Sequence, residues 1–144
     1  MTTRYSSLVN VKKNIVQQKE RGVESANLNL QNAKKAVDSS YAELTQIQAP
    51  QNGKINDFIS TRVLLDAQRA LIKHNEEWLS YASKEIENAK QDLKGAMIEY
   101  EKFKYLEYQE LQKELSRKKL KEAKELDEIA LVVHTRKSTQ KVFS

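Results

Sequence analysis

The stretch Ala49-Pro50-Gln51-Asn52-Gly53 decides the fold, because it holds the only proline of the chain and one of its three glycines. Proline disfavours helical geometry in the residue that precedes it, and an Asn-Gly pair favours a tight reversal. The remaining sequence offers no comparable cluster of turn-forming residues. The sequence therefore predicts a single turn, over residues 49–54, between two helices.

Apolar residues recur at alternating steps of four and three residues before this turn. Ten of the thirteen positions are apolar or aromatic. Such a 3.5-residue repeat is typical of the seam of a left-handed coiled coil, meaning the row of side chains that faces a partner helix. We therefore expect a first helix over residues 3–48. Its seam positions are Tyr5, Val9, Lys12, Val16, Lys19, Val23, Ala26, Leu30, Ala33, Val37, Ser40, Leu44 and Ile47.

The same alternation follows the turn and predicts a second helix over residues 55–138. The next positions in phase after Phe103 are Glu107 and Glu110, and because both are charged we expect a stutter there. The apolar stripe would then resume in a shifted frame, as Tyr108, Leu111, Leu115, Leu126, Ile129, Ala130 and Val133. The seam before the stutter comprises Phe58, Thr61, Leu65, Gln68, Ile72, Asn75, Leu79, Ala82, Ile86, Ala89, Leu93, Ala96, Tyr100 and Phe103.

These patterns predict an all-α fold: a long two-helix antiparallel coiled-coil hairpin, a single unit over residues 1–144, with an overhanging C-terminal helix. If the chain folds back about Asn52, Tyr5 lies opposite about residue 99. The second helix then continues alone for roughly 35 residues, a length of about 50 Å at 1.5 Å per residue. Two alternatives stay open for the overhang: it folds back into a three-helix bundle, or it pairs with a second copy.

Charge and composition narrow the function classes. The net charge is +5, but Lys and Arg are mixed with Glu and Asp along the chain. No cysteine is present, and no window approaches the ~18 apolar residues of a membrane span. We expect a soluble, cytoplasmic protein without membrane insertion, and a monomer when free.

Catalysis requires groups that converge, and the predicted hairpin keeps them apart. His74 and His134 are separated by 60 residues of one helix, or ~90 Å. Gly22, Gly53 and Gly95 are isolated, so no phosphate-binding loop is present. We therefore expect that the protein is not an enzyme and that it has no catalytic residue, no cofactor and no metal site. Acidic residues surround the aromatic cluster near Tyr105, which argues against nucleic acid and leaves protein partners.

The C-terminal stripe resembles a known family. Lys124, Asp127, Glu128 and Ala130 are similar to the Lys-x-x-Asp-Glu-x-Ala signature late in FliJ, a flagellar type III export protein. The Arg-Tyr-x-x-Leu opening at residues 4–8, the length and the single turn near residue 52 match as well. The resemblance spans nearly the whole chain.

The resemblance implies a function. FliJ proteins are antiparallel coiled coils that act as a central stalk and adaptor: they bind the hexameric export ATPase FliI, contact the export gate protein FlhA and escort export chaperones at the inner membrane. The resemblance places five residues in the ATPase ring, namely Leu126, Asp127, Glu128, Ile129 and Val133.

The family's gate contact maps to four residues on one face of the second helix, namely Val63, Ala67, Ala70 and His74. Two alternatives remain. One is the equivalent stalk protein of an injectisome-type secretion system. The other, from a different class, is a structural coiled coil that self-associates.

Overall fold

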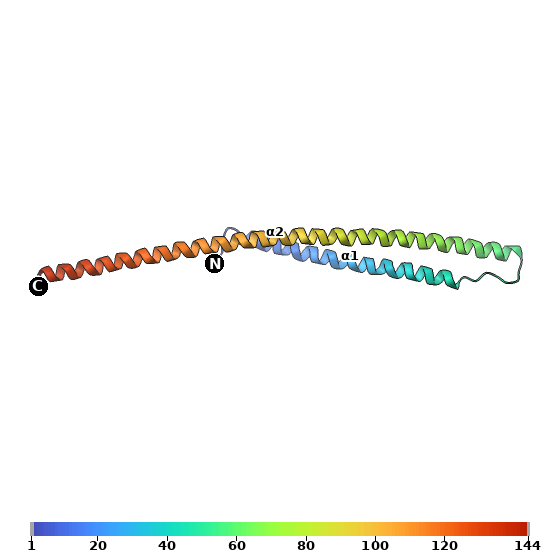
Figure 1. The fold of residues 1–144 in the computed structure, drawn as a ribbon, viewed down its shortest axis with the longest axis horizontal. Coiled ribbons are helices and arrows are strands. Elements are labelled where there is room, and N and C mark those ends of the chain that lie inside the picture. Colours follow the sequence, from blue (N-terminus) through green and yellow to red (C-terminus); the bar gives the residue numbers. More distant parts are fainter. Residues whose placement is uncertain (1, 144) are drawn as a thin grey trace. The chain divides into compact units, whose positions relative to one another are not determined.

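A computed structural model describes the backbone of residues 2–143 and the side chains of residues 2–139. The described residues form two helices, α1 (Ser6–Gln46) and α2 (Ile55–Phe143). The two long helices pack against each other as a hairpin, which confirms the predicted fold class (Figure 1). The chain divides into two compact units, residues 13–98 and residues 1–12 with 99–144.

Local hydrogen bonds fix where each helix begins. At the start of α1, the Thr3 hydroxyl accepts from the Tyr5 amide at 3.2 Å, and the Ser6 hydroxyl accepts from the Thr3 amide at 2.9 Å. This reciprocal arrangement is a capping box in which serine takes the place of glutamate. At the start of α2, the Asp57 carboxylate accepts from the Lys54 amide at 3.2 Å. Its charge also suits the positive end of the helix dipole.

The unit formed by residues 13–98 is a two-stranded seam with a thin core. All the predicted seam positions of this unit are buried or half-buried except Phe58, which is 46% exposed. Small side chains at Ala33 and Ala82 are fully buried and allow the two helices to approach closely. The sequence therefore predicted the face of each helix correctly. The buried apolar residues are Val16, Ala33, Ile72, Ala82 and Ile86.

A polar layer interrupts this seam. The Asn75 amide donates to the Ala36 carbonyl at 3.2 Å and to the Ser40 hydroxyl at 3.4 Å. The Gln68 amide donates to the Ser40 carbonyl at 2.8 Å and to Glu43 at 3.1 Å. Asn75 and Ser40 are both buried, so these hydrogen bonds offset the cost of removing their polar groups from water. We call Ser40, Gln68 and Asn75 the polar layer.

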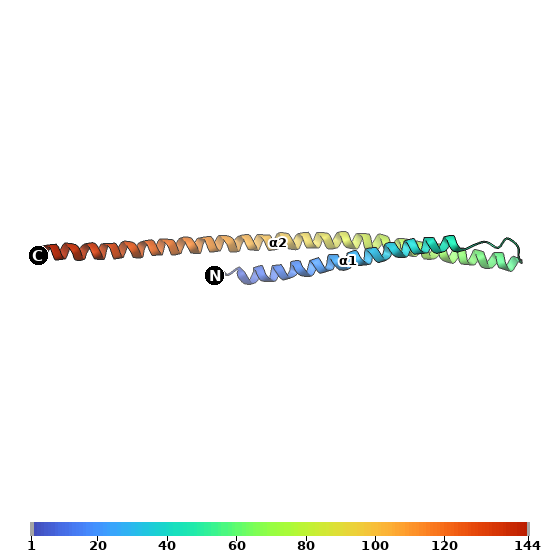
Figure 2. The same cartoon turned by 90° about the horizontal axis from the view of Figure 1, so that it is seen from below.

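The connection between the helices is longer and more extended than the predicted tight turn. Residues 47–54 are not helical, and no residue in 2–143 has a positive φ, so Asn52-Gly53 does not form the mirror-image turn that an Asn-Gly pair favours. Gly53 matters for another reason: a Cβ there would lie 2.7 Å from the Asp57 carboxylate. In both views the first turns of α2 extend beyond the C-terminal end of α1 (Figures 1 and 2).

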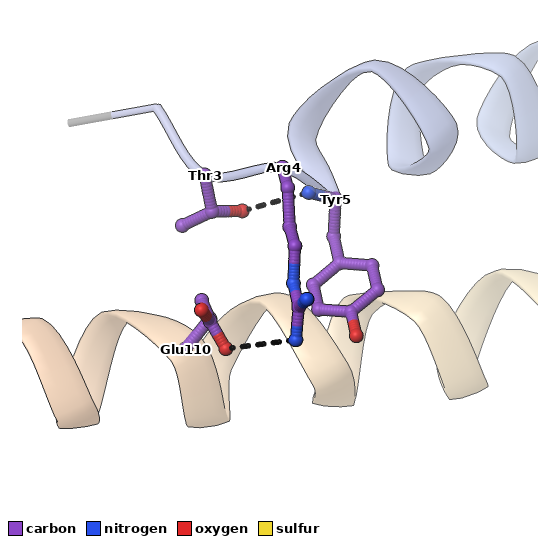
Figure 3. A network of polar contacts seen from close by, with 4 residues as sticks. All are labelled: Thr3, Arg4, Tyr5 and Glu110. Carbon is purple, nitrogen blue, oxygen red and sulfur yellow. Dashed lines mark hydrogen bonds and ion pairs between the residues drawn. The ribbon is translucent and has the colours of Figure 1, made fainter.

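In the other unit, the first residues of the chain lie against α2. Arg4 contacts Glu110 at 3.7 Å and stacks 4.9 Å from the centre of the Tyr5 ring (Figure 3). Two turns later, the Lys12 ammonium lies 3.9 Å from Glu99 and 5.5 Å from the centre of the Phe103 ring.

These contacts correct two predictions. Tyr5 was expected opposite about residue 99, but its neighbour Arg4 reaches Glu110. The stutter after Phe103 was also wrong. Glu107 and Glu110 keep the original phase and are half-buried, and so is Glu114 one step later, whereas Tyr108 of the shifted stripe is 59% exposed. Glu110 can stay in the seam because Arg4 contacts it.

Beyond this contact α2 has no neighbouring helix in the described part of its unit. Leu115 and every described side chain that follows, to residue 139, are exposed. The unpaired part of α2 therefore begins after Glu114, and not near Tyr100 as expected from the sequence.

Candidate partner-binding surfaces

The described residues of the hairpin present exposed strips of side chains. Within residues 2–139 no group of three or more His, Cys, Asp or Glu side chains is placed to hold a metal ion. His74 and His134 are both exposed and belong to different units. The hollows along the helices are open to solvent, so they lack the enclosure that small-molecule sites usually have.

The first surface is the C-terminal strip, which we define as Leu126, Asp127, Glu128, Ile129 and Val133. All five side chains are exposed, and Leu126 and Ile129 are exposed by 66% and 60%. The spacing of the three apolar residues at i, i+3 and i+7 puts them on one side of α2. Asp127 and Glu128 follow Leu126 at 100° and 200° around the helix, so they flank this apolar row.

The apolar part of this region is wider than the predicted strip. Leu131 and Val132 are 65% and 52% exposed on other sides of the same turn. The prediction missed both because it followed a single stripe. Residues 129–133 are five consecutive apolar residues, and such a run on a lone helix is the signal that would have found them, since no helix face remains polar there.

The second surface is the mid-helix strip, which we define as Val63, Ala67, Ala70 and His74. All four are exposed and lie on one side of α2 within the unit of residues 13–98. The structure therefore places them together as a surface and not as seam residues. Ile59, also exposed, continues the row by one turn and was not predicted. It lies four residues before Val63, which is the spacing of neighbours on a helix surface.

The pKa of one tyrosine is perturbed by a contact between the two helices. The Tyr41 hydroxyl donates to the Glu76 carboxylate across the two helices. This hydrogen bond, followed by the negative charge of Glu76 and by desolvation, raises the pKa of Tyr41 above its ordinary value. The contact tethers α1 and α2 next to the polar layer, and it leaves a neutral phenol at physiological pH.

The family model described as "Flagellar FliJ protein" matches residues 1–139. No curated protein and no solved structure matches the sequence. Across the described residues, neither helix contains an apolar stretch long enough to cross a membrane.

Proposed function

The chain belongs to the flagellar FliJ protein family, and from this premise we propose that it is the non-enzymatic central stalk and adaptor of the flagellar protein export ATPase. Family membership makes it a flagellar export-related protein. The proposal goes further and concerns what it binds. The observation that carries it is the exposed C-terminal strip, on the part of α2 that has no partner helix in the described part of its unit.

The C-terminal strip has the chemistry of a protein contact. A lone helix in water is marginal, and exposed Leu126, Ile129 and Val133 favour burial against a partner. We propose that this partner is the export ATPase FliI, with the strip inside its hexameric ring. Asp127 and Glu128 flank the apolar row and would meet basic groups of the ring.

We assign the mid-helix strip to the export gate protein FlhA. Val63, Ala67, Ala70 and His74 offer a shallow, mostly small-residue surface to which a partner helix or loop can approach closely. The gate contact and the ATPase contact use different units of the chain. We also propose that the protein escorts export chaperones. It would then lie beside the export apparatus at the inner membrane.

The test of the ATPase contact uses the double variant Leu126→Ala with Ile129→Ala. Because a few buried apolar anchors dominate most protein interfaces, apparent affinity for FliI should fall about tenfold or more. The measurement is ATP hydrolysis by purified FliI titrated with the full chain. Thermal melting should stay unchanged, since neither side chain packs within the described part of its unit.

The matched control is Leu28→Ala with Leu64→Ala, which removes two exposed leucines outside both strips. It should stimulate hydrolysis like the unmodified chain. Equal stimulation by the strip variant and the control would refute the ATPase assignment, as would a complete lack of stimulation by the unmodified chain. A concentration-dependent sedimentation coefficient that the strip variant abolishes would instead support self-association.

A further inference from the structure

The tip of the hairpin carries an incomplete stretch of seam. Helix α1 ends at Gln46. Helix α2 begins at Ile55, and its seam positions start within its first turns. Phe58 is 46% exposed and Leu65 half-buried. Both residues line a hollow at the hairpin tip. The extended segment 47–54 follows α1 at this tip (Figure 1).

An extended segment fills less space than a helix, and the difference remains as a groove. The groove has a volume of about 370 Å³. One wall comes from Ala49 and Pro50, which have short side chains. The other comes from five residues on one side of α2: Phe58, Thr61, Arg62, Leu65 and Arg69. We call this hollow the tip groove.

The charge of the tip groove is basic. Arg62 and Arg69 line it seven residues apart on α2, which separates them by about 10 Å along the helix axis. Arg69 contacts Asp66 at 3.7 Å, but both side chains are more than 60% exposed. An exposed pair of this kind contributes little stability, so Arg69 can exchange Asp66 for another carboxylate at small cost.

We propose that the tip groove binds one amphipathic protein helix that lies along the side of α2 that carries Arg62 and Arg69, next to segment 47–54. Its apolar face packs on Phe58 and Leu65. Two carboxylates seven residues apart meet Arg62 and Arg69, and a large apolar side chain between them fills the groove. This is docking of a helix into a groove, and it is independent of the ATPase contact because it uses none of the residues of the C-terminal strip.

The chemistry of the groove favours a protein helix over other ligands. Its apolar walls offer burial, which a phosphate backbone would not use. Among its lining residues only two are basic, whereas sequence-independent binding of nucleic acid relies on many phosphate contacts. Its open side would leave much of a small molecule in water, unlike the enclosed sites that such ligands prefer.

The probe is an end-capped, fluorescein-labelled helical peptide with Glu at positions i and i+7 and Leu at i+4. Fluorescence anisotropy measures its binding to the full chain. Binding should be saturable, and a peptide with Lys in place of both Glu residues should bind at least about tenfold more weakly, because like charges then face each other.

Two variants test the site itself. Arg62→Glu with Arg69→Glu should weaken the Glu peptide at least about tenfold. Lys84→Glu, an exposed change of the same sign elsewhere on α2, should leave affinity within about twofold. Circular dichroism of each variant checks that the hairpin stays folded. Absence of saturable binding, equal binding of the two peptides, or equal loss in the control variant would each overturn the proposal.

Discussion

Tyr41 is an exposed residue whose contact with the other helix makes the stability of the hairpin depend on pH. Its hydroxyl donates to Glu76, and the pKa of Tyr41 is raised. The fold therefore favours the neutral phenol over the phenolate. A group whose pKa is higher in the folded state contributes stability below its unfolded pKa, about 10 for tyrosine, and loses that contribution as pH rises through the folded pKa.

We predict that Tyr41→Phe lowers the free energy of unfolding at neutral pH, and that this deficit begins to shrink near pH 10 and is lost as pH rises through the raised pKa of Tyr41. The measurement is urea unfolding of both chains across the alkaline range. Tyr81→Phe is the control, since Tyr81 is exposed and has no hydrogen bond among the described residues. A deficit that stays constant from neutral to alkaline pH would show that the hydrogen bond to Glu76 is not the source of the lost stability.

Single residues also mark the limit of sequence-based prediction. Lys12 was recognised as a seam residue, and its place beside Phe103 and Glu99 agrees with that assignment. Glu110 was excluded from the seam because it is charged, yet its side chain is only 20% exposed and contacts Arg4. A pattern of apolar residues in one helix carries no information about a basic residue that precedes the other helix, so this pairing could not be predicted.

At the scale of the helices, the polar layer is the feature that distinguishes one alignment from another. Apolar seam positions repeat every seven residues, so sliding one helix by a heptad preserves most of their contacts. Gln68 and Asn75 resist such a slip: they are themselves one heptad apart, so after it only one of the two amides could face Ser40 and the carbonyl of Ala36, and the other would lose its hydrogen bonds. A buried polar residue at a seam position is known to fix register at some cost in stability.

We predict that Asn75→Leu with Gln68→Leu keeps or raises the melting temperature and loses the single register. The chain has no cysteine, so Lys34→Cys and Ser80→Cys can carry spin labels at two exposed positions. The unmodified layer should give one distance. The variant should give a second distance population, because a heptad slip moves one helix about 10 Å along the other.

Lys73→Leu adds an exposed leucine on the same helix without touching the polar layer, and it should leave the distance distribution unchanged. If the double variant also keeps one narrow distance, the register is set by the connection at residues 47–54 and not by the polar layer. The form of this connection is also why the register of α1 against α2 was predicted incorrectly. The sequence located the turn correctly, but an extended segment of eight residues and a tight reversal place α1 differently along α2.

At the scale of the whole chain, the sequence predicted the fold class and family correctly. It also predicted that α2 continues without a neighbouring helix, and Leu126, Ile129 and Val133 are exposed in the structure. It missed the breadth of the apolar surface at residues 129–133 and the groove at the tip. Both depend on what lies beside a helix in space, and a periodic pattern along one helix specifies only which side is apolar.

One part of α2 packs against α1 and another part does not, so the local stability of α2 should differ along its length. Residues 72–98 pack against α1 within their unit, whereas residues 116–139 are exposed on every side. A lone helix opens by local fraying, but a paired helix opens only when the seam separates. We predict that amide hydrogens of residues 116–139 exchange at least about tenfold faster than those of 72–98, a difference of about 1.4 kcal/mol or more in opening free energy.

Hydrogen exchange followed by mass spectrometry measures this difference in the free chain and again with FliI added. Protection should then rise in residues 116–139 and stay unchanged in residues 72–98. The Leu126→Ala and Ile129→Ala variant should show the same fast exchange when free and no added protection with FliI. Slow exchange of residues 116–139 in the free chain, at a concentration where sedimentation gives a monomer, would mean that this segment is covered by its own chain and is not available as a stalk.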